Sequence, residues 1–328
     1  MTRRSQSPAD LPSAGLPPGA DAITRRGFLT RTAALALAAP FATTACATPG
    51  TEVTIRLAAG EKGGFYHAFA QLLARTAATT GLRIEPLTTA GSLDNLALLA
   101  RGDADTALIL ADSLEDNPDP PQAIGRVYEN YLQLAVATDS PLHTVADLRG
   151  TRINLGSAGS GATRTGEKLL RAADLDPTQL TITHLPLQEA ATALTTGTLD
   201  ALLWAGGVPT PALTTPALRL LDLGTLTTPM RNRFGYLYDP VLIPAGTYPA
   251  SPASPAIHTI GVANLLVATP TLPDDTATAL TDVLLRHADS LVPTEAAGTQ
   301  FLDARSLIGT GSIPLHPGAA HAYRTNHG

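Results

Sequence analysis

The chain has 328 residues, of which 44% are hydrophobic and 15% charged, a composition typical of a globular protein with a large core. Its formal net charge is −6. Removal of residues 1–45, which hold five Arg and two Asp, would leave 17 basic and 26 acidic residues and a net charge of −9. So acidic a chain binds nucleic acid poorly, and we expect no nucleic-acid partner.

Residues 1–45 have the pattern of an export signal preceded by an N-terminal extension. The stretch "TRRGFLT" pairs two Arg with Phe28 and Leu29, and an uncharged run follows up to Ala45. Paired Arg before Phe-Leu is typical of twin-arginine export. We therefore expect an extracytoplasmic protein, and no later stretch has the unbroken apolar length of a membrane span.

Cys46 follows the signal directly and is the only cysteine, so it cannot form a disulfide within the chain. Small residues precede it in "TTAC". We expect lipid on Cys46 to anchor the mature protein to the outer face of the cytoplasmic membrane. The alternative is cleavage nearby and release of an unanchored protein.

From residue 51 onward, apolar strands alternate with helical stretches. Residues 112–125, rich in Pro and Asp, are interpreted as a surface loop. Strands are predicted at 53–59, 82–87, 105–111, 131–138, 151–156, 180–187, 199–207 and 257–268. Helices are predicted at 65–79, 92–102, 162–175, 188–197 and 274–292.

This alternation predicts an α/β protein with parallel sheets in two lobes. We assign lobe I to residues 51–140 plus 257–328 and lobe II to residues 141–256, with a cleft between them. Ligands of open α/β sheets bind beyond the carboxyl ends of the strands. Three glycine-rich turns lie at such ends, at residues 60–64, 90–91 and 156–161.

The turn "GSAGSGAT" has the spacing of a phosphate-binding loop, but Ala162 stands where that loop has Lys. Its glycines and the following helix N-terminus can still bind an anion through backbone amides. We predict a carboxylate site here, with Ser157, Ser160 and Gly161 as contacts. The alternative is an ordinary capped strand-to-helix turn.

The other two turns follow the same logic. Gly64, Phe65 and Tyr66 open a helix after residues 60–63, and Tyr66 offers an apolar face and a hydroxyl. Ser92 and Asn95 follow the turn at residues 90–91 as neutral hydrogen-bonding groups. The alternatives are core packing for the aromatics and helix capping for Ser92.

Trp204, the only tryptophan, precedes a Gly-Gly pair and is predicted to form an apolar wall of the site, with core packing as the alternative. The histidines are scattered without metal-binding spacing, and no G-x-S-x-G motif occurs. We expect no metal, no cofactor and no catalysis. The enzymatic alternative, a secreted hydrolase or transferase, would need His67 or His184 as a base near Ser160.

The ordered stretches "GGFYHA", "TAGSLDNLALLARGDAD", "DLRGTRINLGSAGSG", "LDALLWAGGVPTPAL" and "IPLHPGA" resemble the TAXI family of solute-binding proteins, which serve TRAP-type transporters. The resemblance covers about residue 53 to the C-terminus. It implies a type II periplasmic-binding-protein fold that closes over a small carboxylate, such as a glutamate-like amino acid or a dicarboxylate, and delivers it to TRAP-type permease subunits. The alternative partner of the closed form is a sensor kinase.

Carried over from this family, the ligand pocket would include a set of neutral side chains and one glycine: Tyr66, Ser92, Asn95, Ser157, Ser160 and Gly161. Trp204 stands where the family often has an aromatic or large apolar residue. The chain departs from the family pattern at Phe65, His67, Ala90 and Thr151. Two of these departures, Phe65 and His67, flank Tyr66.

Overall fold

A computed structural model describes residues 54–114, 120–235, 238–248, 255–293, 302 and 304–327. All of them belong to one compact unit. The predicted export signal and Cys46 lie outside the described residues. Among the residues described, no helix combines the length and the apolar character needed to cross a membrane.

The described strands form one mixed sheet in the order β2-β1-β3-β10-β4-β7-β5-β6, with β8 paired to β4 and β9 paired to β10. β1, β2 and β3 are parallel, as are β5, β6 and β7. The strands are β1 (Thr54–Ala58), β2 (Arg83–Leu87), β3 (Thr106–Leu110), β4 (Gln122–Ala137), β5 (Arg152–Asn154), β6 (Thr181–Thr183), β7 (Ala201–Gly206), β8 (Leu218–Leu221), β9 (Tyr238–Ile243) and β10 (Ile257–Ala268).

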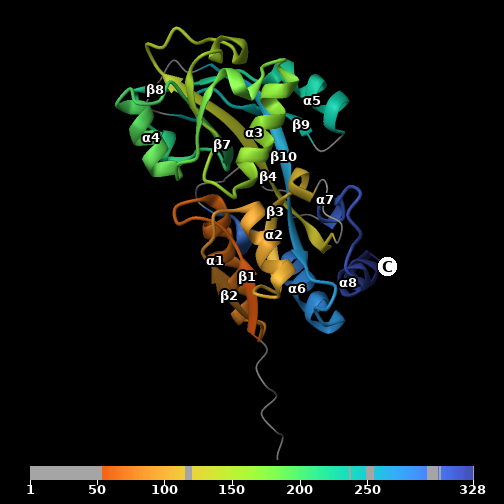
Figure 1. Ribbon diagram of the computed structural model, residues 1–328. Helices are drawn as coiled ribbons and strands as arrows, with labels where there is room; N and C mark the ends of the chain where they lie inside the picture. Colours follow the sequence, from red (N-terminus) through yellow and green to blue (C-terminus); the bar gives the residue numbers. More distant parts are fainter. Residues whose placement is uncertain are drawn as a thin grey trace, which may run out of the picture. The chain divides into compact units, whose positions relative to one another are not determined.

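The α-helices cover the faces of this sheet, as expected for parallel strands joined by crossover helices. We call β1–β3 with α1 and α2 the first half, and β5–β7 with α3 and α4 the second half (Figure 1). The helices are α1 (Phe65–Ala78), α2 (Ser92–Arg101), α3 (Gly161–Ala172), α4 (Leu187–Thr195), α5 (Thr227–Phe234), α6 (Asp274–Arg286), α7 (Ala304–Leu307) and α8 (Pro317–His327).

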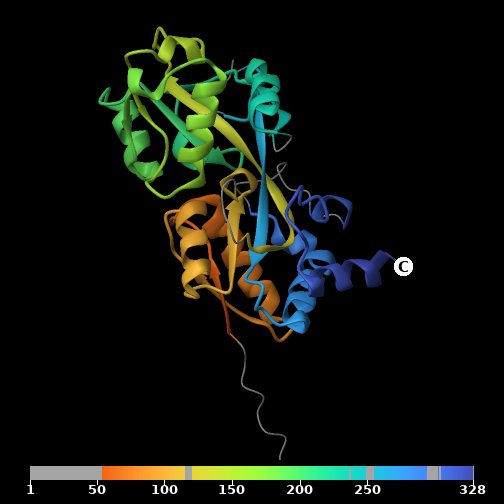
Figure 2. The same ribbon diagram turned by 45° about the vertical axis from the view of Figure 1, so that its right-hand side comes forward.

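Two long antiparallel strands run from one half to the other. β10 pairs with β3 and with the first part of β4, while the last part of β4 pairs with β7 and β8. Figures 1 and 2 show β4 and β10 side by side between the two groups of helices. Any movement of one half against the other must therefore bend or twist this pair of strands.

The apolar positions of α1 explain how the first half is packed. Phe69 and Leu73 are fully buried one turn apart on the side of α1 that faces the sheet. The ring of Tyr128, from β4, lies beneath this helix with its centroid 4.1 Å from that of Phe65. This packing fixes the N-terminal end of α1 at the carboxyl end of β1.

The structure confirms the predicted strand over residues 257–268 and the starts of the first two helices at residues 65 and 92. It corrects the surface loop predicted for residues 112–125, because β4 begins at Gln122 and is almost wholly buried. Asp112 and Ser113, within that predicted loop, are also buried. Proline and aspartate are poor strand formers, so local composition concealed this strand end.

Candidate functional site

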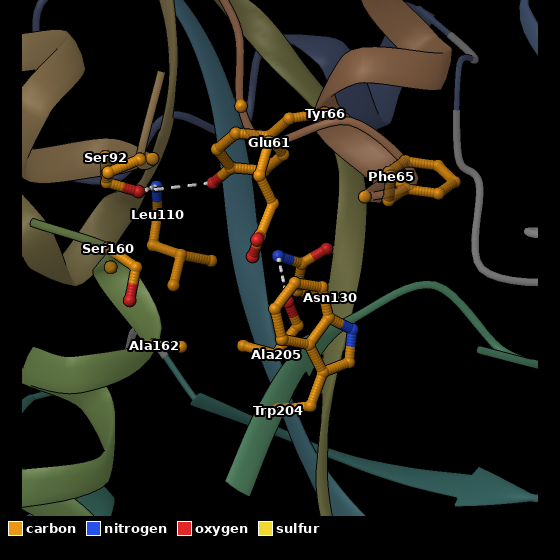
Figure 3. Close-up of a pocket in the computed structure, with 15 residues that line it drawn as sticks. Glu61, Phe65, Tyr66, Ser92, Leu110, Asn130, Ser160, Ala162, Trp204 and Ala205 are labelled. Carbon is orange, nitrogen blue, oxygen red and sulfur yellow. Dashed lines mark hydrogen bonds between the residues drawn. The ribbon is translucent and has the colours of Figure 1, made fainter. Parts of the chain in front are cut away.

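A small pocket of about 50 Å³ lies where the N-terminal ends of α1, α2 and α3 meet (Figure 3). This central pocket has room for a few water molecules but not for a whole amino acid. Its lining residues come from both halves of the molecule and from β4: Gly60, Glu61, Gly64, Phe65, Tyr66, Ala90, Gly91, Ser92, Leu110, Asn130, Ser160, Gly161, Ala162, Trp204 and Ala205.

Most of the residues proposed from the sequence line this pocket. The structure brings together the following members of that set: Gly64, Phe65, Tyr66, Ser92, Ser160, Gly161 and Trp204. Asn95 and Ser157 are not among the lining residues. The three glycine-rich turns, far apart in sequence, therefore converge at one place, as the strand-end argument expected.

The turn before α1 leaves the amides of its helix free. The Gly64 amide donates to the carbonyl of Glu61, which shapes the turn, and α1 begins at Phe65 without a side-chain cap. The amides of Phe65 and Tyr66 donate to no acceptor among the described residues. Both residues line the pocket. This helix end therefore offers unsatisfied donors and a positive partial charge to the pocket.

Tyr66 connects this turn to the next. Its hydroxyl lies 3.3 Å from the Ser92 hydroxyl, which also accepts from the Leu110 amide at 2.9 Å (Figure 3). Burial raises the pKa of the Tyr66 phenol well above its ordinary value. Tyr66 therefore stays protonated and serves as a neutral hydrogen-bonding group.

The turn before α2 has a structural use. Asn95 is fully buried, and its amide nitrogen donates to the carbonyls of Ala59 and Leu108 at 2.7 and 2.6 Å. Its oxygen accepts from the Thr89 hydroxyl at 2.6 Å. These contacts occupy the side chain and tie α2 to the ends of β1 and β3.

The turn before α3 closes onto α2. The Gly159 carbonyl accepts from the amides of Leu93 and Asp94 at 3.0 and 3.1 Å, so it occupies the N-terminal amides of α2. Gly156 and Gly159 have φ values of +90° and +85°, a conformation that glycine adopts at no steric cost. This turn therefore places the Gly159 carbonyl at the N-terminus of α2, and the helix that follows the turn is α3.

Ser160 and Gly161 face the pocket from the same turn. The Ser160 hydroxyl accepts from the Thr163 amide at 3.3 Å and so caps α3. The amides of Gly161 and Ala162 donate to no acceptor among the described residues. The N-terminus of α3 thus presents free donors to the pocket, as that of α1 does.

Ser157 lies beside the pocket rather than in its lining. Its hydroxyl is buried and makes no hydrogen bond of ordinary geometry among the described residues. It nevertheless stands close enough to the Glu61 carboxylate to oppose a rise in the pKa of that group.

Two polar lining residues, Glu61 and Asn130, escaped the sequence reasoning. The half-buried Glu61 carboxylate accepts from the Leu187 amide, the first of α4, at 3.4 Å and points into the cavity in Figure 3. Burial raises the pKa of this carboxyl above its ordinary value, against the effects of the Leu187 amide and the Ser157 hydroxyl. Asn130 is 2% exposed and donates to the Ala205 carbonyl at 3.2 Å, while its side-chain oxygen has no partner within the described part of the chain.

Each of these residues left a signal in the sequence. Glu61 lies inside a glycine turn already expected to border the site. Asn130 directly precedes the strand predicted at residues 131–138. A polar side chain in a buried central strand needs a partner, which makes it a site candidate.

The geometry does not assemble the hydrolase alternative, because neither His67 nor His184 is hydrogen-bonded to Ser160 among the described residues. The Ser160 hydroxyl pairs with the amide and hydroxyl of Thr163. His184 lies 3.3 Å from the Gly156 carbonyl. His67 lines a separate pocket of about 70 Å³, on which Trp204 also borders. Within the described ranges, no group of three or more His, Cys, Asp or Glu side chains could hold a metal ion.

Solved structures of low sequence identity resemble this chain. A protein from Bordetella bronchiseptica RB50 is 16% identical, with a TM-score of 0.58 over 84% of this chain and 98% of that one. The substrate-binding protein of an amino acid ABC transporter is 15% identical, with a TM-score of 0.46 over 73% and 96% of the two chains. The periplasmic aliphatic sulphonate binding protein of Escherichia coli is 17% identical, with a TM-score of 0.43 over 83% and 82%.

The sheet order and the likeness to the Bordetella structure confirm the predicted fold class, an α/β protein with the type II periplasmic-binding-protein fold. The model of the NMT1-like family matches residues 57–326. The chain therefore belongs to the NMT1-like family.

Proposed function

We propose that this protein is an extracytoplasmic solute-binding protein that captures a small carboxylate between two lobes and delivers it to a TRAP-type membrane transporter. The observation that carries the proposal is the pair of free helix N-termini, those of α1 and α3, that line one pocket from opposite halves. Free amides at a helix N-terminus bind carboxylates without a cation.

The size of the pocket supports capture by closure. A pocket of about 50 Å³ holds a few water molecules, and we propose that a larger ligand enters when the two halves are further apart. The contact of Gly159 with the amides of Leu93 and Asp94 joins the two halves beside the pocket. We propose that residues 51–140 plus 257–328 and residues 141–256 move as lobes that make and break this contact, with β4 and β10 as the hinge.

Delivery to TRAP-type permease subunits rests on the TAXI-like motifs of the sequence, which include the turns that line the pocket. We further propose that twin-arginine export and lipid on Cys46 hold the protein at the outer face of the cytoplasmic membrane, where such a transporter would meet it.

Intrinsic fluorescence tests ligand capture, because the only tryptophan of the chain lines the pocket. The full chain is titrated with acetate, propionate, glutarate, L-glutamate, phosphate and AMP, and each is repeated as a thermal shift. A carboxylate should change the emission and, at a hundred times its Kd, stabilise the fold by about 2.7 kcal/mol. Trp204→Phe is the control: it should remove the optical signal and keep a thermal shift. A response to phosphate or AMP alone would overturn the proposal.

A further inference from the structure

The charges around the central pocket are unbalanced. Among the described residues that line it, Glu61 is the only Asp, Glu, Lys, Arg or His. The effects that shift the pKa of Glu61 include no basic side chain. For a site that binds a carboxylate, a negative side chain without a cationic partner requires an explanation, because like charges repel strongly away from bulk water.

The side-chain oxygen of Asn130 is a second hydrogen-bond acceptor in the pocket that lacks a donor among the described residues. The Asn130 side chain is almost fully buried, its nitrogen is held by the Ala205 carbonyl, and its oxygen has no partner among the described residues. A buried amide oxygen without a donor is costly, and such groups are usually satisfied by a ligand or a water molecule. Glu61 and Asn130 thus offer acceptors, while the ends of α1 and α3 offer donors.

A ligand with two chemically different ends would satisfy both sets. Its carboxylate would take the amides of α1 and α3, and its ammonium group, which is only a donor, would take the oxygens of Glu61 and Asn130. A dicarboxylate would instead place its second charge near Glu61.

We propose that Glu61 is the specificity-determining residue that binds the ammonium group of the ligand, so that the site selects amine-bearing carboxylates over dicarboxylates. This inference rests on the proposed capture of a carboxylate and names the class of that ligand. The competing explanation is that Glu61 serves only to cap α4 through the Leu187 amide.

The test uses three matched pairs that differ only in the amine: glycine and acetate, L-alanine and propionate, L-glutamate and glutarate. Affinities of the full chain and of Glu61→Gln are measured by calorimetry. The Gln side chain keeps an oxygen for the Leu187 amide but loses the charge. Glu189→Gln is the matched control, because Glu189 is exposed on α4 and acts on Glu61 only through its charge.

In the wild type, an amine-bearing member should bind at least tenfold more tightly than its partner. Glu61→Gln should reduce this ratio about tenfold or more, and Glu189→Gln should change it less than twofold. Equal binding within a pair, or a ratio that Glu61→Gln leaves unchanged, would overturn the role of Glu61 while carboxylate capture stands. Absence of binding by all six compounds at millimolar concentration would overturn carboxylate capture and this inference with it.

Discussion

The turns before α1 and α2 look alike in sequence but are used differently. Both follow a parallel strand, contain glycine and open a helix at the same edge of the sheet. In the turn before α2, the amides of Leu93 and Asp94 donate to the Gly159 carbonyl, and the Asn95 side chain donates to two backbone carbonyls. In the turn before α1, the amides of Phe65 and Tyr66 have no acceptor among the described residues, and both residues line the pocket.

This difference shows that a glycine turn at a helix N-terminus is only a potential anion site. Whether its amides are available depends on what the rest of the chain places opposite them. The Gly159 carbonyl of the second half lies opposite the amides at the start of α2, whereas the central pocket lies at the start of α1. We therefore expect substitutions in the α2 turn to affect stability or closure, and substitutions in the α1 turn to affect ligand binding.

The largest expected effect tests the structural use of the α2 turn. Asn95→Ala removes three buried hydrogen bonds, so the free energy of unfolding should fall by about 3 kcal/mol in urea titrations. Ligand affinity of the folded protein should stay within about twofold. The control is Ser157→Ala, because the buried Ser157 hydroxyl makes no hydrogen bond of ordinary geometry among the described residues, and its loss should cost less than about 0.5 kcal/mol. Normal stability with abolished binding in Asn95→Ala would make the α2 turn a ligand-binding turn.

An intermediate effect tests the contact between the turns. A Cβ at Gly161 would lie 2.5 Å from the Ser92 hydroxyl oxygen and 2.8 Å from a Leu110 methyl carbon, both in the first half. Gly161→Ala should therefore resist closure by roughly 1–3 kcal/mol and weaken ligand binding about tenfold in fluorescence titrations.

The matched control for this contact is Gly166→Ala. Its Cβ would lie 2.7 Å from a Leu203 methyl carbon within the second half, so it should reduce stability without weakening the binding of ligand by the folded protein. Equal losses of affinity in the two variants would show that closure does not depend on the contact between Gly161 and Ser92.

The smallest expected effect concerns pH and the α1 turn. Because burial raises the pKa of Glu61, the folded protein keeps a proton that the unfolded chain has already released. Stability should therefore fall as pH rises from the ordinary carboxyl value of 4.5 through the raised pKa of Glu61. Glu61→Gln should remove this pH dependence. We expect the change in the free energy of unfolding to be a few tenths of a kcal/mol, because water screens a half-exposed group.

The fall of stability with rising pH that Glu61 causes has to be separated from a larger fall that Glu129 causes. Glu129 is 1% exposed, and burial raises its pKa to about 7 despite its ion pair with Arg126. Urea unfolding from pH 4.5 to pH 8 is therefore compared between Glu129→Gln and the double variant with Glu61→Gln. Identical pH profiles would show that Glu61 is not measurably perturbed in the folded protein.

Much of the secondary structure was predictable from the sequence, because it depends on local sequence patterns. The apolar strand over residues 257–268 and the glycine-to-helix starts at Phe65 and Ser92 are local signals, and the structure confirms them. The convergence of the three turns also followed, since the carboxyl ends of parallel strands meet at one edge.

What could not be predicted depends on contacts between distant segments. Nothing near Asn95 shows that its partners are the carbonyls of Ala59 and Leu108, and nothing near Gly159 shows that its carbonyl meets α2. The sequence places Glu61 only within the glycine-rich turn at residues 60–64, because its contact with Leu187 spans 126 residues. Such pairings are fixed by the sheet topology, which a single sequence states only indirectly.

The position of β10 has a consequence for the growing polypeptide. This strand lies between β3 and β4, yet it is made from residues 257–268, long after both neighbours have left the ribosome. Until then, the nascent chain carries strand edges whose hydrogen-bonding groups await a partner, the feature that makes incomplete sheets prone to aggregation. A stop codon before residue 257 would therefore remove the middle of the sheet and not merely its last segment, and newly made chains need protection until the final quarter of the message has been translated.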